Sequence, residues 1–258
     1  MTGRLIAEVR GRGEPVAVLA IDPSSPFSGG AILGDRVRMD EHTLDAGVFI
    51  RSLATRGHLG GLALAAPEAV RALDAAGFPW VLVETVGVGQ VEVEVAATAD
   101  TTIVVVNPGW GDAVQAAKAG LLEIADVFVI NKADRPGADD AKRDLEHVLA
   151  LTSGPADRWM PPIVSTVALD GTGVADVLDA VRAHRGWLEQ GGRLEAKRAA
   201  RIDDELEAIL VARLRARVRA AAVDEVRARL HDEVAARRLD PWSAADQLLA
   251  VVEDSGSG

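Results

Sequence analysis

Short runs of apolar, β-branched residues recur along the chain and alternate with longer stretches of helical periodicity. Runs that are apolar at every position indicate strands buried on both faces, and intervening helices are typical of parallel strands. The pattern predicts an α/β fold with a predominantly parallel sheet covered by helices on both faces. The expected strands are Val16–Ile21, Val48–Arg51, Trp80–Glu84, Thr101–Val106, Val127–Ile130 and Ile163–Ser165. The expected helices are Pro67–Ala76, Asp112–Ile124, Ala138–Leu151 and Gly173–Gln190.

The chain changes character after residue 192, where apolar residues recur at steps of three and four among charged ones. This spacing predicts amphipathic helices. The apolar positions are Ile202, Leu206, Ile209, Leu210, Leu214 and Val218, then Val223, Val226, Leu230 and Val234. Pro241 opens a last short helix, and a polar, glycine-rich end follows it. We therefore expect a main domain at 1–192, a helical arm at 193–253 and a disordered tail at 254–258.

Composition excludes several classes of function. The net charge of −11 would repel a phosphate backbone, and tyrosine is absent, so nucleic acid is not an expected partner. No apolar run is long enough to cross a bilayer, so no membrane partner is expected either. The absence of cysteine excludes disulfides, zinc–thiolate sites and thiol catalysis, and it fits a cytoplasmic protein.

The sequence Asn131-Lys132-Ala133-Asp134 directly follows the expected strand Val127–Ile130. A carboxylate at Asp134 could accept both the ring N1–H and the exocyclic N2–H of guanine, whereas adenine offers no matching pair of donors. Asn131 could meet the other edge of the base, and the Lys132 stem could pack on its face. These residues predict a guanine site. The alternative is a polar turn in which Asp134 caps a helix.

The segment Thr166-Val167-Ala168 follows the next expected strand. It resembles the Ser/Thr-x-Ala turn with which P-loop GTPases brace the base through backbone N–H groups. Because ligands of parallel α/β sheets bind beyond the carboxyl ends of the strands, this turn is expected beside the Asp134 motif. Taken alone, the segment is equally well explained as an ordinary strand exit.

Acidic residues at strand ends predict a magnesium site. Glu84 ends the run Trp80–Glu84, Asp22 follows the first strand, and Asp35 lies further along the same connection. Mg²⁺ is a hard cation that prefers oxygen ligands, and these carboxylates together would form a shell built from three loops. Gly87 would let the backbone approach a γ-phosphate. Taken singly, Glu84 could instead cap a helix, and Asp22 could belong to a plain turn.

A third group of polar residues lies after the glycine-flanked loop at 107–111. Asp112, Gln115 and Lys118 share one face of the helix expected there. A loop of this kind, placed after a sheet strand, suits a segment that moves on ligand binding. A solvated first helical turn explains the same pattern equally well.

Five segments together resemble, in order, the core of the MeaB/ArgK GTPases. They are AVLAIDPSSPFSGGAILGDRVRM, VFIRSLATRGHLGG, WVLVETVGVGQVEVEVA, NPGWGDAVQAAKAGLLEIADVFVINKAD and STVALDGTGV. The C-terminal helices, which end in RRLDPWSAADQLL, are similar to the dimerisation arm of that family. The resemblance covers nearly the whole chain and implies a P-loop α/β domain of the SIMIBI type with a helical arm.

The resemblance also implies a function. Members of this family hydrolyse GTP to GDP with Mg²⁺, and they gate cofactor loading and protection of an adenosylcobalamin-dependent acyl-CoA mutase such as methylmalonyl-CoA mutase. The implied partners of the chain are therefore that mutase and a second copy of itself, as a homodimer.

Residue roles follow from the same resemblance. The implied magnesium site comprises Asp22, Asp35 and Glu84. The implied guanine site comprises Asn131, Lys132 and Asp134, and the stretch from Glu84 to Gln90, with Gly87, corresponds to the second switch. A third switch, which responds to the mutase, would carry Asp112, Gln115 and Lys118 as catalytic residues.

One family element is absent from the sequence. Family members carry a G-x-x-x-x-G-K-[ST] loop before the segment VAVLAID, but none of the four lysines here, Lys118, Lys132, Lys142 and Lys197, precedes Ser or Thr. That loop would supply the phosphate cradle and one magnesium ligand. We expect the coding sequence to begin further upstream. The 258-residue chain would then lack one sheet strand, bind GTP weakly and hydrolyse it slowly.

Two alternatives stay open. A shortened protein could still dock on the mutase as a non-enzymatic interaction module. The second alternative is a GTPase of another metal or cofactor insertion pathway, but such relatives carry clustered His or Cys ligands. Here cysteine is absent and the histidines are scattered, at His42, His58, His147, His184 and His231.

Overall fold

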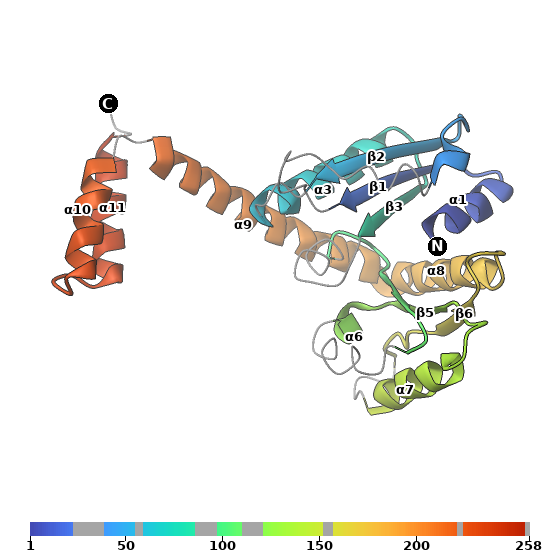
Figure 1. Ribbon diagram of the computed structural model, residues 1–258. Coiled ribbons are helices and arrows are strands. Elements are labelled where there is room, and N and C mark those ends of the chain that lie inside the picture. Colours follow the sequence, from blue (N-terminus) through green and yellow to red (C-terminus); the bar gives the residue numbers. More distant parts are fainter. Residues whose placement is uncertain are drawn as a thin grey trace. The chain divides into compact units, whose positions relative to one another are not determined.

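The computed structural model describes residues 1–22, 39–54, 59–85, 97–109, 121–151, 157–220 and 224–255. The chain divides into two compact units, Met1–Ile202 and Asp203–Gly258. The first unit contains every described strand, and the described part of the second is helical (Figure 1). Within the described ranges, no helix has the length and apolarity needed to cross a bilayer.

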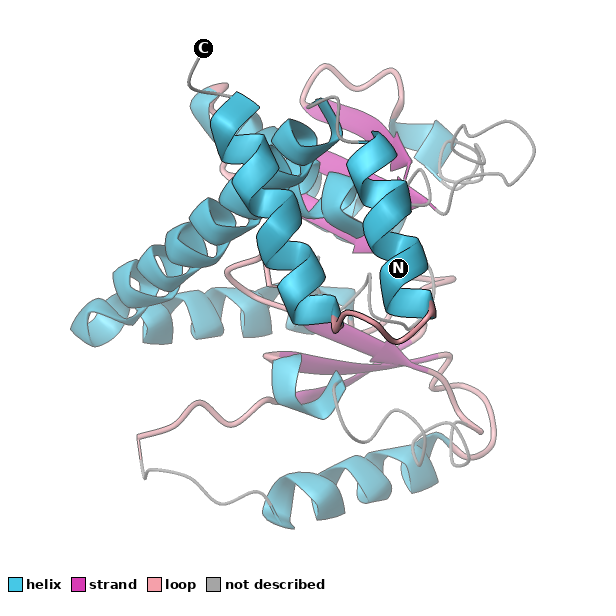
Figure 2. Ribbon diagram, turned by 90° about the vertical axis from the view of Figure 1, so that its left-hand side faces the viewer, coloured by secondary structure: helices cyan, strands magenta, loops and turns pink. Residues whose placement is uncertain are grey.

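The described strands form two three-stranded parallel sheets. β1 (Val16–Asp22) lies between β2 (Val48–Ala54) and β3 (Trp80–Thr85), and β5 (Val127–Asn131) lies between β4 (Ile103–Val106) and β6 (Ile163–Thr166). Figure 2 shows the two groups of magenta strands. The parallel α/β fold expected from the sequence is confirmed. The strands form two sheets rather than one because no described strand pairs with the outer edge of β3 or of β4.

Helices accompany both sheets of the first unit. They are α1 (Thr2–Gly11), η1 (Asp40–His42), α3 (Leu59–Ala75), α6 (Leu121–Ile124), α7 (Ala138–Leu151), α8 (Val174–Glu189), η2 (Gln190–Gly192) and the beginning of α9 (Arg193–Ala220). α7 has the expected bounds, and α8 differs from the expected helix by one residue at each end. Of the helix expected at Asp112–Ile124, only α6 lies within the described residues.

α3 differs from its expected bounds, because it begins at Leu59 and carries Pro67 inside it. Proline favours the first turn of a helix, since it lacks an N–H donor, which agrees with the expected start at Pro67. In the structure, Ala66 precedes the proline and is fully buried in one cluster with Ile21 of β1. That packing stabilises helix on both sides of the proline.

The central strand β1 explains why its sequence is apolar at every position. Val16 and Val18 pack with α1, whereas Ala17 and Leu19 face the opposite layer and pack with Leu73 of α3. Successive side chains of a strand point to opposite faces, so a strand covered on both faces needs apolar residues throughout. These four strand residues are at most 1% exposed.

The second sheet repeats this arrangement around β5. Val127 and Val129 pack with α8, while Phe128 and Ile130 pack with Leu145 of α7 on the other face. Figure 1 shows α8 and α7 on opposite sides of β5 and β6. All four strand side chains are fully buried, so the end of β5 is a fixed platform for whatever follows it.

α1 and α8 join the two sheets into one core. Leu178 of α8 belongs to the cluster around β1, and Leu5 of α1 packs with Val127 of β5 and Val177 of α8. Leu82 of β3 also packs against this second cluster. Two parallel sheets therefore share one pair of covering helices.

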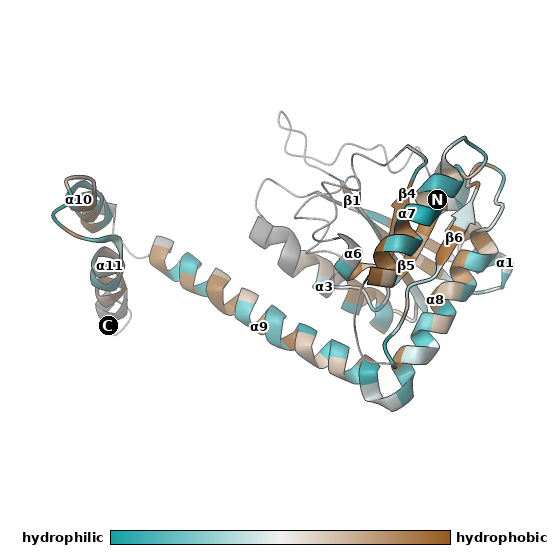
Figure 3. Cartoon of the chain, turned by 90° about the horizontal axis from the view of Figure 1, so that it is seen from below, coloured by the Kyte–Doolittle hydropathy of each residue, from teal (hydrophilic) through white to brown (hydrophobic). Residues whose placement is uncertain are grey.

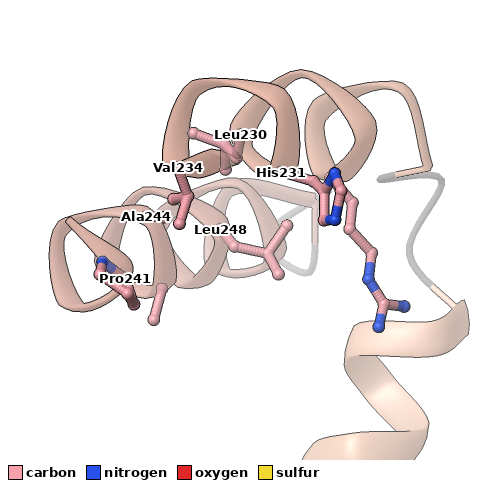
Figure 4. Close-up of a pocket in the computed structure, with 8 residues that line it drawn as sticks. Leu230, His231, Val234, Pro241, Ala244 and Leu248 are labelled. Carbon is pink, nitrogen blue, oxygen red and sulfur yellow. The ribbon is translucent and has the colours of Figure 1, made fainter. Parts of the chain in front are cut away.

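The second unit comprises the rest of α9, together with α10 (Asp224–Ala235) and α11 (Pro241–Ser255). Asp240 caps α11, because its Oδ1 accepts hydrogen bonds from Trp242 N and Ser243 N at 2.9 and 3.0 Å. Figure 4 shows Leu230 and Val234 of α10 opposite Ala244 and Leu248 of α11. α11 continues to Ser255, two residues past the expected end of the helical arm at 253.

Candidate guanine-nucleotide site

Asn131 closes β5 and ties it to the end of β6. The residue pairs in register with Thr166, and Ala133 N donates to Thr166 O at 3.0 Å. Asn131 Oδ1 accepts Ala168 N at 3.0 Å and Thr166 Oγ1 at 3.4 Å. The side-chain oxygen therefore clamps the two turns together, which leaves the Nδ2 amide as the group of Asn131 suited to a base.

The next residues turn away from the strand through a rare backbone conformation. Lys132 has φ of 60°, in the left-handed region that non-glycine residues seldom occupy, and its carbonyl accepts Arg135 N at 3.0 Å. Such strained positions cluster at ligand sites. Lys132 and Asp134 are both exposed. A Cβ built on Gly137 would lie 3.8 Å from Gly109 N, so this loop lies beside the loop that follows β4.

The turn after β6 closes on itself. Val167 N donates to Thr172 O at 3.0 Å, and Gly171 N donates back to Val167 O at 3.0 Å. Gly173 has φ of 73°, and a Cβ there would lie 2.3 Å from Ser165 O. Only glycine fits that position without displacing the strand end. The hydrogen bond from Thr172 N holds the pKa of Asp170 below its ordinary value.

The expected magnesium ligands lie in part at the same end of the first sheet. Ala20 pairs with Glu84 in the register of β1 and β3, so Asp22 and Glu84 close neighbouring parallel strands. Glu84 Oε2 is shielded from solvent. Among the described residues no three His, Cys, Asp or Glu side chains converge as a metal site. Asp35, Gly87, Asp112, Gln115 and Lys118 lie outside the described residues, as does the side chain of Asp22.

One contact of this site was not expected from the sequence. Arg4, in the first turn of α1, donates from Nε to Ala168 O at 3.1 Å and from Nη2 to Leu169 O at 2.5 Å. The partners are separated by more than 160 residues along the chain. Since Arg4 belongs to no motif, only the folded arrangement of α1 and α8 discloses the contact.

The opposite ends of the same strands carry a polar cluster that the sequence also did not disclose. The ring of His184, on α8, is 1% exposed; its Nδ1 lies 2.8 Å from Thr101 Oγ1 and its Nε2 lies 3.3 Å from Asp126 Oδ1. The rings of Trp159 and Trp187 lie 4.9 and 5.8 Å from it, centroid to centroid. Burial lowers the pKa of His184, although the charge of Asp126 opposes the shift.

Lysine and arginine side chains on the first turns of α9 bind this cluster. Asp100 accepts Arg198 Nη2 at 2.6 Å and Arg201 Nη2 at 3.0 Å. Lys197 Nζ lies 2.8 Å from Asp100 O and 3.4 Å from Asp126 Oδ2. Burial raises the pKa of Asp100, but the two arginine hydrogen bonds outweigh it and the pKa stays below its ordinary value. These charged side chains are paired with one another within the fold.

The arrangement at the ends of β5 and β6 suits recognition of a purine base. An Asn-Lys-x-Asp turn and a Thr-x-Ala turn are locked to each other where ligands of parallel α/β sheets bind. Fold and motif together define the class of protein, which is an α/β GTPase.

The comparisons with known proteins specify the family. The sequence profile described as methylmalonyl Co-A mutase-associated GTPase MeaB matches residues 1–223, and the chain belongs to that family. It is 48% identical over 255 residues to a Pyrococcus abyssi protein whose name assigns it to the GTPases, with 98% of this chain and 79% of the relative covered. It is 40% identical over 189 residues to GTPase ArgK of Escherichia coli, with 72% and 57% covered.

A solved structure agrees with this assignment. The crystal structure of a LAO/AO transport system kinase superposes with a TM-score of 0.70 at 26% sequence identity, covering 97% of this chain and 76% of that one. The resemblance to the MeaB/ArgK family and the P-loop α/β fold class are therefore both confirmed.

Proposed function

We propose that this chain binds guanine nucleotides beyond the ends of β5 and β6 and hydrolyses GTP to GDP and phosphate. The observation that carries the proposal is the clamp at Asn131, whose Oδ1 holds Ala168 N at 3.0 Å and Thr166 Oγ1 at 3.4 Å. This clamp, together with the hydrogen bond from Ala133 N to Thr166 O, ties the turn of Asp134 to the turn of Ala168 at neighbouring strand ends. A planar base would be held between them.

Base selectivity would come from Asp134. Its carboxylate accepts two hydrogen bonds from the N1–H and N2–H edge of guanine, and hydrogen bonds to a charged group contribute about 1.5–3 kcal/mol each. Adenine presents an unprotonated ring nitrogen on the equivalent edge and has no 2-amino group. The exposed Lys132 stem can cover one face of the base, since long cationic side chains pack their methylenes on flat surfaces.

Hydrolysis is a phosphoryl transfer to water. The water oxygen attacks the γ-phosphorus, the bond from that phosphorus to the bridging oxygen breaks, GDP departs, and one water proton is released. When bound, Mg²⁺ neutralises charge on the phosphates. Asp22, Asp35 and Glu84 would hold it, and the fit rests on carboxylates that close the neighbouring strands β1 and β3, one with an oxygen shielded from solvent. The proposed catalytic residues are Asp112, Gln115 and Lys118.

The proposed partner is an adenosylcobalamin-dependent acyl-CoA mutase, whose cofactor loading the GTPase cycle would gate. The family description supports this partner, because it names the GTPases as associated with methylmalonyl-CoA mutase. Co-purification with the mutase, combined with GTP turnover in the complex, would support the whole proposal. Stable binding to the mutase without any turnover would instead indicate a docking module.

We also propose a homodimer formed through the helical arm. Leu206, Leu210 and Leu214 recur every four residues on α9 and are 47–59% exposed. Figure 3 shows brown apolar residues alternating with teal polar ones along α9. An exposed apolar stripe of this kind needs a covering surface. Sedimentation velocity should give twice the monomer mass, and a monomer at high micromolar concentration would contradict the dimer.

The sharpest test of base recognition replaces one carboxylate oxygen of Asp134 with an amide nitrogen. Asp134→Asn converts an acceptor pair into one acceptor and one donor, which matches xanthine better than guanine. We expect GDP to bind about 100-fold more weakly and XDP to bind more tightly than to the unmodified chain. Saturation-transfer NMR at millimolar nucleotide keeps weak binding measurable. Asp139→Asn is the control, because it removes the same charge from an exposed residue of α7. Unchanged GDP affinity in Asp134→Asn would refute the proposed site.

A further inference from the structure

The arginine at the start of α1 contacts the turn after β6 from outside. Arg4 donates from Nε to Ala168 O at 3.1 Å and from Nη2 to Leu169 O at 2.5 Å. An arginine that uses two donors of its planar fork fixes both distance and orientation. The two carbonyls belong to consecutive peptide groups at the tip of the turn, so one side chain restrains both.

The same turn is held from the inside by Asn131, whose Oδ1 accepts Ala168 N. Ala168 therefore makes two hydrogen bonds: its N–H donates to Asn131, and its carbonyl accepts from Arg4. Further hydrogen bonds within the turn come from Asp170 N and Gly171 N, which both donate to Val167 O. The turn has one defined shape because both of its sides are restrained.

The position of Arg4 is itself fixed by its neighbour. Leu5 is 7% exposed and packs with Val127 and Val129 of β5 and with Val177 of α8. α1 lies next to α8 in Figure 1, and Gly173, just before α8, ends the turn that Arg4 contacts. The backbone that carries the Arg4 guanidinium is therefore held in place by the packing of α1.

A peptide group is planar, and its N–H points opposite to its carbonyl. When Arg4 holds the carbonyl of Ala168, it also sets the direction of the Leu169 N–H group, whereas the N–H group of Asp170 donates to Val167 O within the turn. A cation on the carbonyl side also polarises the Leu169 amide and strengthens it as a donor. A base braced by this turn would meet a donor that is already oriented, which lowers the entropic cost of binding.

We propose that Arg4 is a positioning residue for guanine recognition, which acts by holding the carbonyls of Ala168 and Leu169 so that the Leu169 amide faces the base. This inference rests on the proposed guanine site. It assigns a role in base binding to α1, which carries none of the nucleotide motifs.

The experiment compares Arg4→Ala and Arg4→Lys with Arg12→Ala in the 258-residue chain. Arg12 is the matched control, because it is the C-cap residue of the same helix and pairs with Glu8 and Asp179 rather than with the turn. Amide hydrogen exchange over residues 165–173 reports the turn without any ligand, and saturation-transfer NMR with GDP and ADP reports binding.

For Arg4→Ala we expect amide exchange in the turn to be about tenfold faster and GDP affinity about fivefold weaker, with ADP binding unchanged. Arg4→Lys should recover part of both effects, since an ammonium can still donate to one carbonyl. Arg12→Ala should change GDP affinity less than twofold.

Two results overturn the positioning role of Arg4. One is unchanged exchange in the turn of Arg4→Ala, and the other is faster exchange with unchanged GDP affinity. Equal loss of GDP affinity in Arg12→Ala would also overturn it, because general destabilisation would then explain the effect. Failure of the guanine site itself is recognised separately, since the unmodified chain would then bind GDP and ADP alike.

Discussion

The two ends of the second sheet treat charged residues in opposite ways. The amino edge comprises residues 97–102, 126 and 157–162, which precede β4, β5 and β6, and its charges are paired: Asp100 with two arginines and Asp126 with Lys197. The carboxyl edge comprises residues 131–137 and 166–173, where Lys132 and Asp134 are exposed and form no ion pair with another described residue. The difference teaches that the charges of the amino edge stabilise the fold, whereas Lys132 and Asp134 stay exposed at the edge where we propose that the nucleotide binds.

The contrast extends to the backbone. At the carboxyl edge Lys132 adopts φ of 60° and Gly173 φ of 73°, whereas every described residue of the amino edge has negative φ. For the non-glycine residue Lys132 this conformation costs about 1–3 kcal/mol and persists where the surrounding structure enforces it, whereas glycine adopts positive φ without such strain. At Lys132 the carboxyl edge therefore holds a strained backbone conformation that the amino edge does not have.

The largest effect is expected at Gly173. Gly173→Ala forces a side chain into φ of 73° and brings its Cβ to 2.3 Å from Ser165 O, so about 3 kcal/mol of unfolding free energy should be lost. Gly171→Ala is the control: its φ of 93° imposes strain, but nothing lies within 4 Å of the new Cβ, and about 1 kcal/mol is expected. Urea unfolding compares the two variants. Equal losses would show that the turn tolerates a shift at Gly173.

A smaller effect is expected at the amino edge. Asp100→Ala removes the carboxylate that pairs with Arg198 and Arg201 at a partly buried position, and about 2 kcal/mol of unfolding free energy should be lost. Asp157→Ala removes a 74% exposed partner of Arg193, and such surface pairs contribute about 0.5 kcal/mol or less. Urea unfolding midpoints distinguish them. Equal losses in the two variants would contradict a stabilising role for the cluster at the amino edge.

The smallest effect is a pH dependence at His184. Because burial lowers its pKa below 6.5, the folded chain binds fewer protons than the unfolded chain as the pH falls below 6.5. Stability should therefore fall between pH 7.5 and pH 5.5, by about 1 kcal/mol from this residue. His184→Gln should be less stable at pH 7.5 but lose less on acidification, whereas His231→Gln, at an exposed histidine, should follow the unmodified chain. Parallel pH profiles for His184→Gln and the unmodified chain would exclude His184 as the cause.

The sequence predicts the parallel fold well because β1 and β5 are buried on both faces. Their unbroken apolar runs follow directly from that burial, as the packing of Val127 and Phe128 on opposite faces shows. The Asn131–Asp134 motif is also local, and the structure places it at the strand end where it was expected. Local patterns of this kind need no knowledge of distant contacts.

Other features depend on contacts that are remote in sequence. Arg4 meets Ala168 only after α1 and α8 pack together, and His184 meets Thr101 across more than 80 residues. Neither residue lies in a pattern with a period or a motif, so neither contact can be inferred from neighbouring residues. The early start of α3 was missed for a related reason, since burial of Ala66 against β1 outweighs the local preference of Pro67.

The central claim is that the carboxyl edge recognises the 2-amino group of guanine. Equilibrium binding of GDP and IDP to the unmodified chain tests it most directly, because the two nucleotides differ only in that group. Loss of one hydrogen bond to a carboxylate predicts that IDP binds at least about tenfold more weakly than GDP, with ADP weaker again. Equal affinities for GDP and IDP would contradict the claim.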